Sequence, residues 1–179
     1  VDPIKLIIDN YPEGQSEILV APNNQENEAM GNREITFSKE LYIEREDFMI
    51  EPPKKYFRMF PGNEVRFMHA YFIKCTGYET DENGNVTVVH GTYDPASKGG
   101  TSPDGRKVKG TIHWVDAKTA IPCECRLYEN LIDEEKGVYN EDGSMNINPN
   151  SLTVAHAFVE KYLENVQPYE RFQFVRNGF

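Results

Sequence analysis

Short runs of β-branched and aromatic residues, separated by turn residues, constrain this chain more than any other feature. Residues 4–8, 36–43, 86–93 and 152–158 include such runs, and glycine, proline and asparagine lie between them. Strands this short need frequent turns, which these residue types supply. Residues 159–165 alone favour a short helix. The pattern predicts an all-β fold with minor helix, built as one or two small barrels rather than as alternating strands and helices.

The clearest strand pattern covers residues 64–74. Apolar side chains alternate with other residues along it, which is the two-residue period of a β-strand. Asn83-Gly84 then predicts a hairpin turn, because both residues tolerate a positive φ. Residues 133–150 are acidic and rich in asparagine and glycine, which indicates a surface excursion.

The charge of the chain is unevenly distributed. The formal net charge is −10, and an acidic average argues against a nucleic-acid partner. Residues 51–74, however, hold five Lys and Arg against two acidic residues, and residues 98–118 hold the same numbers. Two basic islands therefore stand in an acidic chain. Charge clustering on solvated faces explains such islands equally well.

Several classes are excluded or disfavoured. No apolar run approaches the roughly 20 residues that a membrane-spanning helix needs. Three cysteines cannot pair evenly, so we expect no disulfide scaffold and a reducing, cytoplasmic setting. The chain begins with Val1 and has no signal-peptide core, so we expect it to be part of something longer.

The sequence offers little for catalysis or metal binding. Cys123 and Cys125 are separated by one residue, whereas a zinc knuckle needs two to four, so with Cys75 and His113 they are better interpreted as core residues than as zinc ligands. Phosphate-loop, nucleophile-elbow and zinc-protease motifs are missing. We therefore expect no metal, no cofactor and no catalysis in this chain.

Arginines interleaved with aromatic residues indicate a surface that binds single-stranded RNA. Arg58, Arg66 and Arg176 lie near tyrosines and phenylalanines, and Gln173 adds both a donor and an acceptor. A guanidinium group can bind a base edge through two donors, and an aromatic ring can stack on an unpaired base. Many β-sheet surfaces share this composition, so the pattern is not specific.

Longer sequence motifs are more specific. Residues 105–115 read GRKVKGTIHWV, residues 126–131 read RLYENL, and residues 172–179 read FQFVRNGF. In this order, with Asp2 to Leu6 and Met30 to Arg33, they resemble the C-terminal region of glutaminyl-tRNA synthetases.

The resemblance implies a fold and a partner. It implies two β-barrels, similar to the barrel of certain ribosomal proteins that bind 5S RNA, which grip the anticodon loop of tRNA(Gln). Residues 1–52 with 150–179 would form the barrel next to the catalytic domain, incomplete at its C-terminus, and residues 53–149 the distal barrel. The catalytic domain, which uses ATP with Mg²⁺, would precede Val1 and be a further partner. We expect a monomer and no membrane association.

The resemblance also implies roles for individual residues. Arg66 would read the first anticodon base, Arg58 the third, and Gln173 with Arg176 the middle uracil. Lys55 would contact the first base or its phosphate, and Asn23 would approach the edge of the loop. The RNA backbone would be held by Lys54, Arg106, Lys107 and Lys109.

Three positions depart from the family pattern. Phe57 and Met68 stand where a Lys and an Arg are common, and Val175 replaces a typical Glu. Each of the first two changes removes a cation, although Phe57 can stack on a base instead, which would preserve affinity and lower its salt dependence. We include Phe57 and Met68 in the predicted anticodon surface.

Other interpretations stay open at this point. A glutamyl-type synthetase region or a barrel that binds ribosomal RNA would share the same architecture. A different class, an acidic β-sandwich that binds no nucleic acid, is suggested by the net charge of −10.

Overall fold

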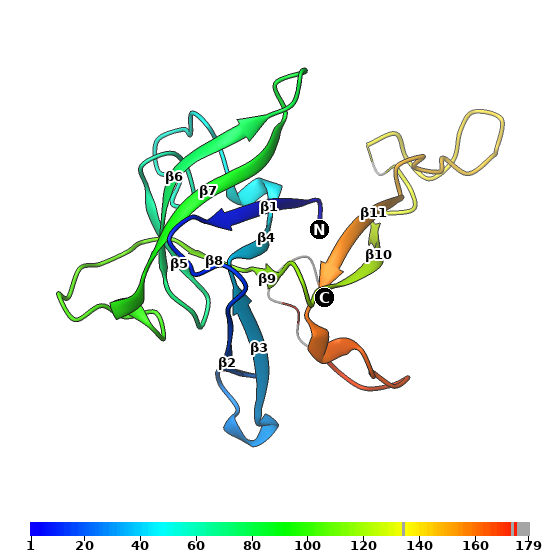
Figure 1. The fold of residues 1–179 in the computed structure, drawn as a ribbon. Coiled ribbons are helices and arrows are strands. Elements are labelled where there is room, and N and C mark those ends of the chain that lie inside the picture. The colour runs from blue at the N-terminus through cyan, green and yellow to red at the C-terminus, as the bar shows by residue number, and fades with distance from the viewer. Residues whose placement is uncertain (134, 173, 175–179) are drawn as a thin grey trace.

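The computed structural model describes residues 1–133, 135–172 and 174, and these residues form mostly strands. The expected all-β class with minor helix is confirmed (Figure 1). The strands are β1 (Pro3–Ile8), β2 (Ser16–Pro22), β3 (Asn32–Ser38), β4 (Glu40–Glu44), β5 (Glu64–Phe67), β6 (Phe72–Thr80), β7 (Val86–Asp94), β8 (Thr111–Ile112), β9 (Val115–Asp116), β10 (Ile121–Tyr128) and β11 (Leu152–Val159). The 3-10 helices are η1 (Glu28–Met30), η2 (Arg45–Asp47), η3 (Pro95–Ser97) and η4 (Lys161–Leu163).

Seven strands form one curled sheet in the order β8-β5-β6-β7-β1-β4-β9. The N-terminal strand β1 lies inside this sheet, parallel to β7 and antiparallel to β4. Strands that are far apart in the sequence therefore lie side by side, and the curl gives the sheet an inner and an outer face (Figure 1).

Two ribbons of two strands extend from the sheet. β2 and β3 pair from Ser16↔Ser38 to Pro22↔Asn32, and β10 and β11 pair from Ile121↔Val159 to Tyr128↔Leu152. Beyond β10 and β11 the chain continues into a projecting arm, residues 129–133 and 135–151, which carries only isolated bridges such as Ile132↔Ile147 (Figure 1). The predicted surface excursion at residues 133–150 coincides with this arm.

One hydrophobic core lies on the inner face of the curled sheet. Ile4, Leu6 and Ile8 alternate along β1 into this core and are at most 2% exposed. Aromatic rings fill its centre: the ring of Phe37 lies edge-on to the ring of Trp114, with 5.2 Å between centroids. Edge-to-face packing of this kind adds stability beyond the area that it buries.

The hairpin at Asn83-Gly84 is confirmed, but the single strand expected over residues 64–74 is wrong. A tight turn divides it into β5 and β6: Phe67 N–H donates to Tyr71 O, and His69 adopts a φ of 60°. The alternation of apolar residues continues through the turn, so the pattern did not reveal it. Similarly, residues 36–43 belong to two strands, β3 and β4, with Lys39 between them.

The sheet pairing bears on the expected division of the chain. The boundaries at residues 52/53 and 149/150 stay a prediction. Strands from both sides of residue 52 are neighbours in the seven-stranded sheet, because β1 pairs with β7. Strands from both sides of residue 149 also pair, because β10 binds β11.

The short helix expected over residues 159–165 is present as the three-residue helix η4. In the part of the chain that the structure describes, no helix has the length and apolar character needed to cross a membrane.

Gly110 allows two segments of the chain to approach closely. A Cβ atom built on Gly110 would lie 1.8 Å from the carbonyl oxygen of Phe57 and 3.1 Å from Val65 Cγ1. Backbone atoms cannot move aside as the end of a flexible side chain can. The contact brings the segment around Phe57 against the segment that leads into β8.

We predict that Gly110→Ala destabilises the fold by about 3 kcal/mol, because the new methyl group must push the two segments apart. Urea unfolding would measure the loss. Gly77→Ala is the matched control: no atom lies within 4 Å of its built Cβ, so its effect should stay within about 0.5 kcal/mol. Equal effects of the two substitutions would contradict the prediction.

Candidate nucleic-acid interface

Three sequence-predicted segments meet at Gly110. The Phe57 carbonyl lies against Gly110, and the Gly110 carbonyl accepts a 2.8 Å hydrogen bond from Arg66 N–H. Lys109 Nζ lies 5.3 Å from the centroid of the Phe57 ring, which is 49% exposed. An exposed ring beside an ammonium group can stack on a base while the cation contacts a phosphate.

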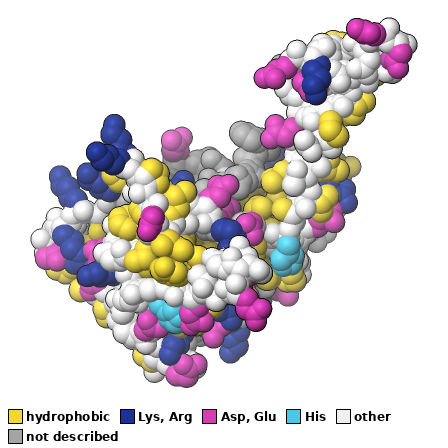
Figure 2. Space-filling model, turned by 90° about the horizontal axis from the view of Figure 1, so that it is seen from above, with side chains coloured by type: hydrophobic (Ala, Val, Ile, Leu, Met, Phe, Trp, Pro, Cys, Tyr) yellow, Lys and Arg dark blue, Asp and Glu magenta, His cyan; other side chains and the backbone are white. Residues whose placement is uncertain are grey.

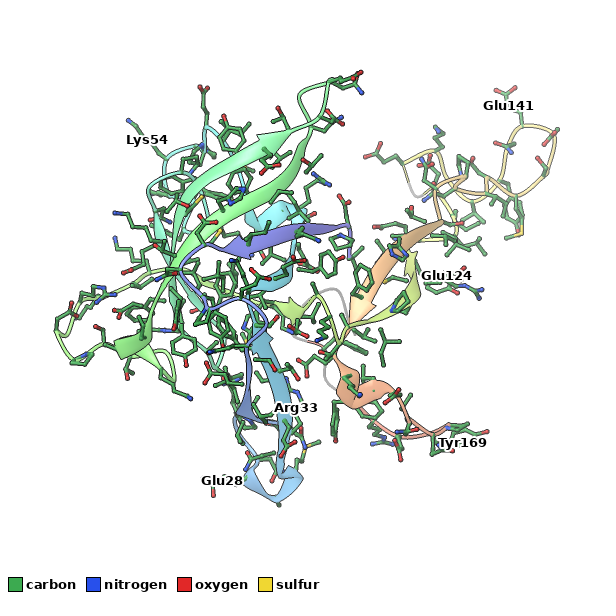
Figure 3. The ribbon with its side chains drawn as sticks, viewed as in Figure 1. Glu28, Arg33, Lys54, Glu124, Glu141 and Tyr169 are labelled. Carbon is green, nitrogen blue, oxygen red and sulfur yellow. The ribbon has the colours of Figure 1, made fainter. Side chains whose placement is uncertain are left out.

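Exposed lysines lie close in the sequence to Phe57 and Gly110, the residues that form this contact. Lys54 and Lys55 lie in a turn closed by a 3.2 Å hydrogen bond from Tyr56 N–H to Pro53 O, and Lys55 adopts a φ of 72°. Lys107 is also exposed. Figure 2 shows Lys and Arg side chains gathered at one side of the sheet body, at the opposite side from the projecting arm. Lys54, which Figure 3 labels, lies at the upper left.

Arg66 is held on the outer face of the sheet. Its neighbours Val65 and Phe67 point into the core, so the Arg66 side chain points the other way. Its Nε donates to Gly100 O at 2.8 Å, and its guanidinium carbon lies 5.5 Å from the centroid of the Phe72 ring. Its two terminal amino groups have no hydrogen-bond partner among the described residues. This arrangement presents two parallel donors, which is the geometry that a base edge can accept.

Arg106 lies against the same ring but has a different environment. Its guanidinium carbon is 5.1 Å from the Phe72 ring centroid. Its five N–H groups meet five acceptors, on Glu64, Asp94, Asp104 and Ser102, at distances between 2.5 and 3.2 Å. The predicted phosphate contact of Arg106 therefore has no free donor in this arrangement.

These contacts also change the ionisation of the groups involved. Hydrogen bonds to Glu64, Asp94 and Asp104 raise the pKa of Arg106. The backbone N–H of Arg106, the Ser102 hydroxyl and the Arg106 guanidinium lower the pKa of Asp104 to about 2. Asp104 is therefore a carboxylate at neutral pH, and Arg106 keeps its positive charge.

Arg58 is bound to a buried carboxylate. Its Nη1 donates to Oδ1 of Asp47, which is 0% exposed, and the Arg58 side chain remains 38% exposed. Asn63 Nδ2 fixes the backbone by donating to Arg58 O at 2.7 Å. Arg58 thus combines a structural ion pair with a surface that can still be reached.

Met68 and Asn23, two further residues of the predicted anticodon surface, lie in different parts of the fold from each other. Met68 lies in the turn between β5 and β6, half-buried, and its carbonyl accepts a 3.0 Å hydrogen bond from Trp114 Nε1. Asn23 follows β2, where its Nδ2 donates to Met30 O at 2.9 Å. Figure 3 places Arg33 and Glu28, which belong to this same ribbon, at the bottom of the molecule and Lys54 at the top. The structure therefore does not bring Asn23 together with the segments that meet at Gly110.

The remaining predicted residues lie outside the described part of the chain. Gln173 and Arg176, expected to hold the middle base, and the departure Val175 are all in this group. The cysteines of the rejected zinc site are described: Cys75 is buried, and Cys123 and Cys125 are half-buried on β10. No cluster of three His, Cys, Asp or Glu that could hold a metal occurs in residues 1–133, 135–172 and 174.

A cleft that sequence reasoning missed lies between the two ribbons. It has a volume of about 400 Å³ and is lined by residues of β3, β4, β10 and β11 and by the segment after β11. Arg33 and Glu160 form a two-bonded ion pair in it, at 2.5 and 3.0 Å, and His113 Nε2 lies 3.3 Å from Glu160. Arg33 ends one of the motifs quoted above and His113 lies in another, but neither motif indicated that a cleft forms here.

The ion pair controls the ionisation of Glu160. Burial alone would raise the pKa of this carboxyl group, but the hydrogen bonds from His113 and Arg33, with the charge of Arg33, outweigh burial and lower it to about 2. Glu160 is thus a carboxylate throughout the physiological range.

Comparisons with known proteins give concordant matches. A family model described as "tRNA synthetases class I (E and Q), anti-codon binding domain" matches residues 1–94, and a second model with the same description matches residues 111–179. The glutamine–tRNA ligase of Clostridium perfringens (strain ATCC 13124) is 55% identical over 183 residues, which cover 100% of this chain and 33% of that protein.

Two further curated proteins show the range of similarity. The glutamine–tRNA ligase of Clostridioides difficile (strain 630) is 56% identical, over 99% of this chain and 32% of its own length. That of Bradyrhizobium diazoefficiens is 47% identical over the same shares. The chain spans about a third of the length of these relatives.

We predict that acid removes a stabilising contribution from Glu160. A carboxyl group whose folded pKa is lowered stabilises the fold above its unfolded pKa, near 4.5, and loses that contribution as pH falls toward about 2. Urea unfolding between pH 5 and pH 2 should show that Glu160→Gln removes a pH-dependent contribution of about 3 kcal/mol. The exposed Glu164→Gln is the control. Parallel pH curves for native protein and Glu160→Gln would contradict the prediction.

We also predict that Arg58→Ala lowers the free energy of unfolding by about 2 kcal/mol, because it removes an ion-pair partner from the fully buried Asp47. Thermal and urea unfolding would measure this loss. Lys107→Ala, which removes an exposed cation, should change stability by less than about 0.5 kcal/mol. Unchanged stability of Arg58→Ala would show that the pair contributes nothing to folding.

Proposed function

The chain belongs to the anticodon-binding domain family of the class I (E and Q) tRNA synthetases, and we propose that it binds the anticodon loop of tRNA(Gln) and reads its bases within a glutamine–tRNA ligase. The relatives described above support the glutamine identity, because their names carry it and their identity to this chain reaches 56%. The ATP- and Mg²⁺-dependent joining of glutamine to tRNA would be performed by a catalytic domain elsewhere in the protein. This chain would contribute binding and no cofactor.

One observation carries the proposal: Arg66 is fixed on the outer face, while its two terminal amino groups have no hydrogen-bond partner among the described residues. A side chain held by Gly100 O and the Phe72 ring loses little conformational entropy when it binds. Two donors in a plane match the paired acceptors of a base edge. Arg66 would therefore read the first anticodon base, as the family resemblance implies.

The other predicted residues take complementary roles in the proposal. Arg58 would read the third base from its ion pair with Asp47, and Phe57 would stack on an unpaired base. Lys55 would contact the first base or its phosphate, and Met68 would border the site where that base binds. Gln173 and Arg176 keep their proposed role at the middle uracil.

Two further residue groups act at the edges of the loop. Lys54, Lys107 and Lys109 would hold the RNA backbone, since each is exposed. Asn23 would reach only the margin of the bound RNA, because it lies on the β2–β3 ribbon. We further propose that the protein is cytoplasmic, since translation takes place in that compartment, and that it is a monomer.

Fluorescence anisotropy with labelled anticodon stem-loops tests the proposal. The full-length protein should prefer CUG and UUG loops over variants with one changed anticodon base. Arg66→Ala should lose about 1–3 kcal/mol for cognate loops and relax discrimination at one base, because it removes a base-reading contact. Lys107→Ala should weaken binding of every loop alike and lower the salt slope by about one unit.

Lys136→Ala is the control for these variants, because Lys136 lies on the projecting arm and pairs with Asp133. Its binding should be unchanged. Preference for the glutamate anticodons would instead favour a glutamyl-type synthetase. Absence of salt-dependent binding to any loop would favour the acidic module that binds no nucleic acid, and equal losses for all loops in Arg66→Ala would overturn the assignment of Arg66.

A further inference from the structure

We propose that Arg106 is a positioning residue: it holds the Arg66 side chain in place for base reading and does not itself contact RNA. This inference rests on the proposed function and deepens it. It replaces the role in phosphate binding that the sequence suggested for Arg106.

A row of paired residues across three strands underlies the inference. Arg66 on β5 stands opposite Phe72 on β6, and Phe72 stands opposite Asp94 on β7. Residues directly opposite one another in antiparallel strands project from the same face. Phe72 therefore lies on the outer face with Arg66, and yet it is only 1% exposed.

Two guanidinium groups cover this phenylalanine. The guanidinium carbons of Arg66 and Arg106 lie 5.5 and 5.1 Å from its ring centroid. Both distances are within the range of cation–π attraction, in which a guanidinium group lies above the face of an aromatic ring. The ring thus forms a common platform, and the position of one arginine limits the positions open to the other.

Arg106 also fixes the loop that supplies the acceptor for Arg66. The loop from Pro95 to Gly105 carries Gly100, whose carbonyl accepts from Arg66 Nε at 2.8 Å. Arg106 binds Asp94 at the start of this loop and Ser102 and Asp104 near its end. These contacts constrain both ends of the loop, while Gly99 N–H and Gly100 N–H hold its middle by donating to Ala70 O at 2.8 and 3.1 Å. Together they set the position of the Gly100 carbonyl, and with it the direction of the Arg66 guanidinium.

Gly100 fits closely against Arg66. A Cβ atom at this position would lie 3.0 Å from Arg66 Cδ, and the φ of Gly100 is 82°, which favours glycine. The Arg66 side chain is therefore enclosed by the loop on one side and the ring on the other.

The hydrogen-bond inventory separates the two arginines by role. All five N–H groups of Arg106 are engaged within the protein, so an RNA phosphate would have to displace a carboxylate or the Ser102 hydroxyl. Arg66, by contrast, uses only Nε among its side-chain donors within the described residues. The geometry assigns positioning to Arg106 and recognition to Arg66.

Arg106→Lys in the full-length ligase tests the inference, because lysine keeps the charge but cannot bridge several acceptors in one plane. Anticodon stem-loops with each base varied in turn would be titrated at several salt concentrations. We expect discrimination at the base read by Arg66 to fall about tenfold, with the salt slope and the discrimination at the other bases unchanged. Lys107→Ala is the matched neighbouring variant and should show the opposite pattern.

A double-mutant cycle distinguishes positioning from a merely structural effect. In the Arg66→Ala background, Arg106→Lys should change discrimination no further, because its effect passes through Arg66. Additive losses, or a uniform loss of affinity with a smaller salt slope, would overturn the inference. If Arg66→Ala alone leaves discrimination intact, the proposed function of Arg66 fails instead, and the two failures remain distinguishable.

Melting temperatures would reveal whether Arg106→Lys has a folding defect. Phe72→Leu is a second variant that tests the same arrangement if it does. Leucine keeps the site apolar but removes the aromatic face. Loss of discrimination at the same base, with binding otherwise retained, would support the platform formed by Phe72. Unchanged discrimination in Phe72→Leu and in folded Arg106→Lys would overturn it.

Discussion

The position of β1 is the constraint on which the rest of the structure depends. This strand forms hydrogen bonds with β7 on one side and with β4 on the other, so it joins the first third of the chain to the strands that carry the candidate interface. Ile4, Leu6 and Ile8 anchor it through complete or nearly complete burial. Without β1 the sheet would be interrupted between β4 and β7, and the inner faces of both parts would lose their common core.

The internal use of carboxylates explains how an acidic chain presents a basic surface. Much of its negative charge near the interface is committed to arginines: Glu64, Asp94 and Asp104 bind Arg106, and Asp47 binds Arg58. By contrast, Lys54, Lys55, Lys107 and Lys109 form no ion pair with any residue that the structure describes, and their side chains are exposed. The net charge of −10 therefore describes the molecule as a whole and not the surface that would meet RNA.

The sequence predicted the class of the fold well and its connections poorly. Short runs and the Asn83-Gly84 turn indicated strands and a hairpin because these are local properties of the chain. The turn that separates β5 from β6 escaped notice, because alternation continues through it and His69 supplies a positive φ that its residue type did not predict. The parallel pairing of β1 with β7 escaped too, since it joins residues about 80 positions apart and leaves no local pattern.

The same limit applied to the candidate site. Arg66 could be singled out as an arginine in an aromatic setting, but the roles of Arg106 and Gly100 depend on a loop that folds back over Phe72. From the sequence alone, the positive charge of Arg106 suggested a contact with an RNA phosphate. Only the three-dimensional arrangement shows that its donors are already used.

The projecting arm has a different consequence: the β10–β11 ladder holds both of its ends together from Ile121↔Val159 to Tyr128↔Leu152. A protease that cuts the exposed arm would leave two fragments still associated through that ladder, so a nicked chain would migrate as one molecule until it is denatured.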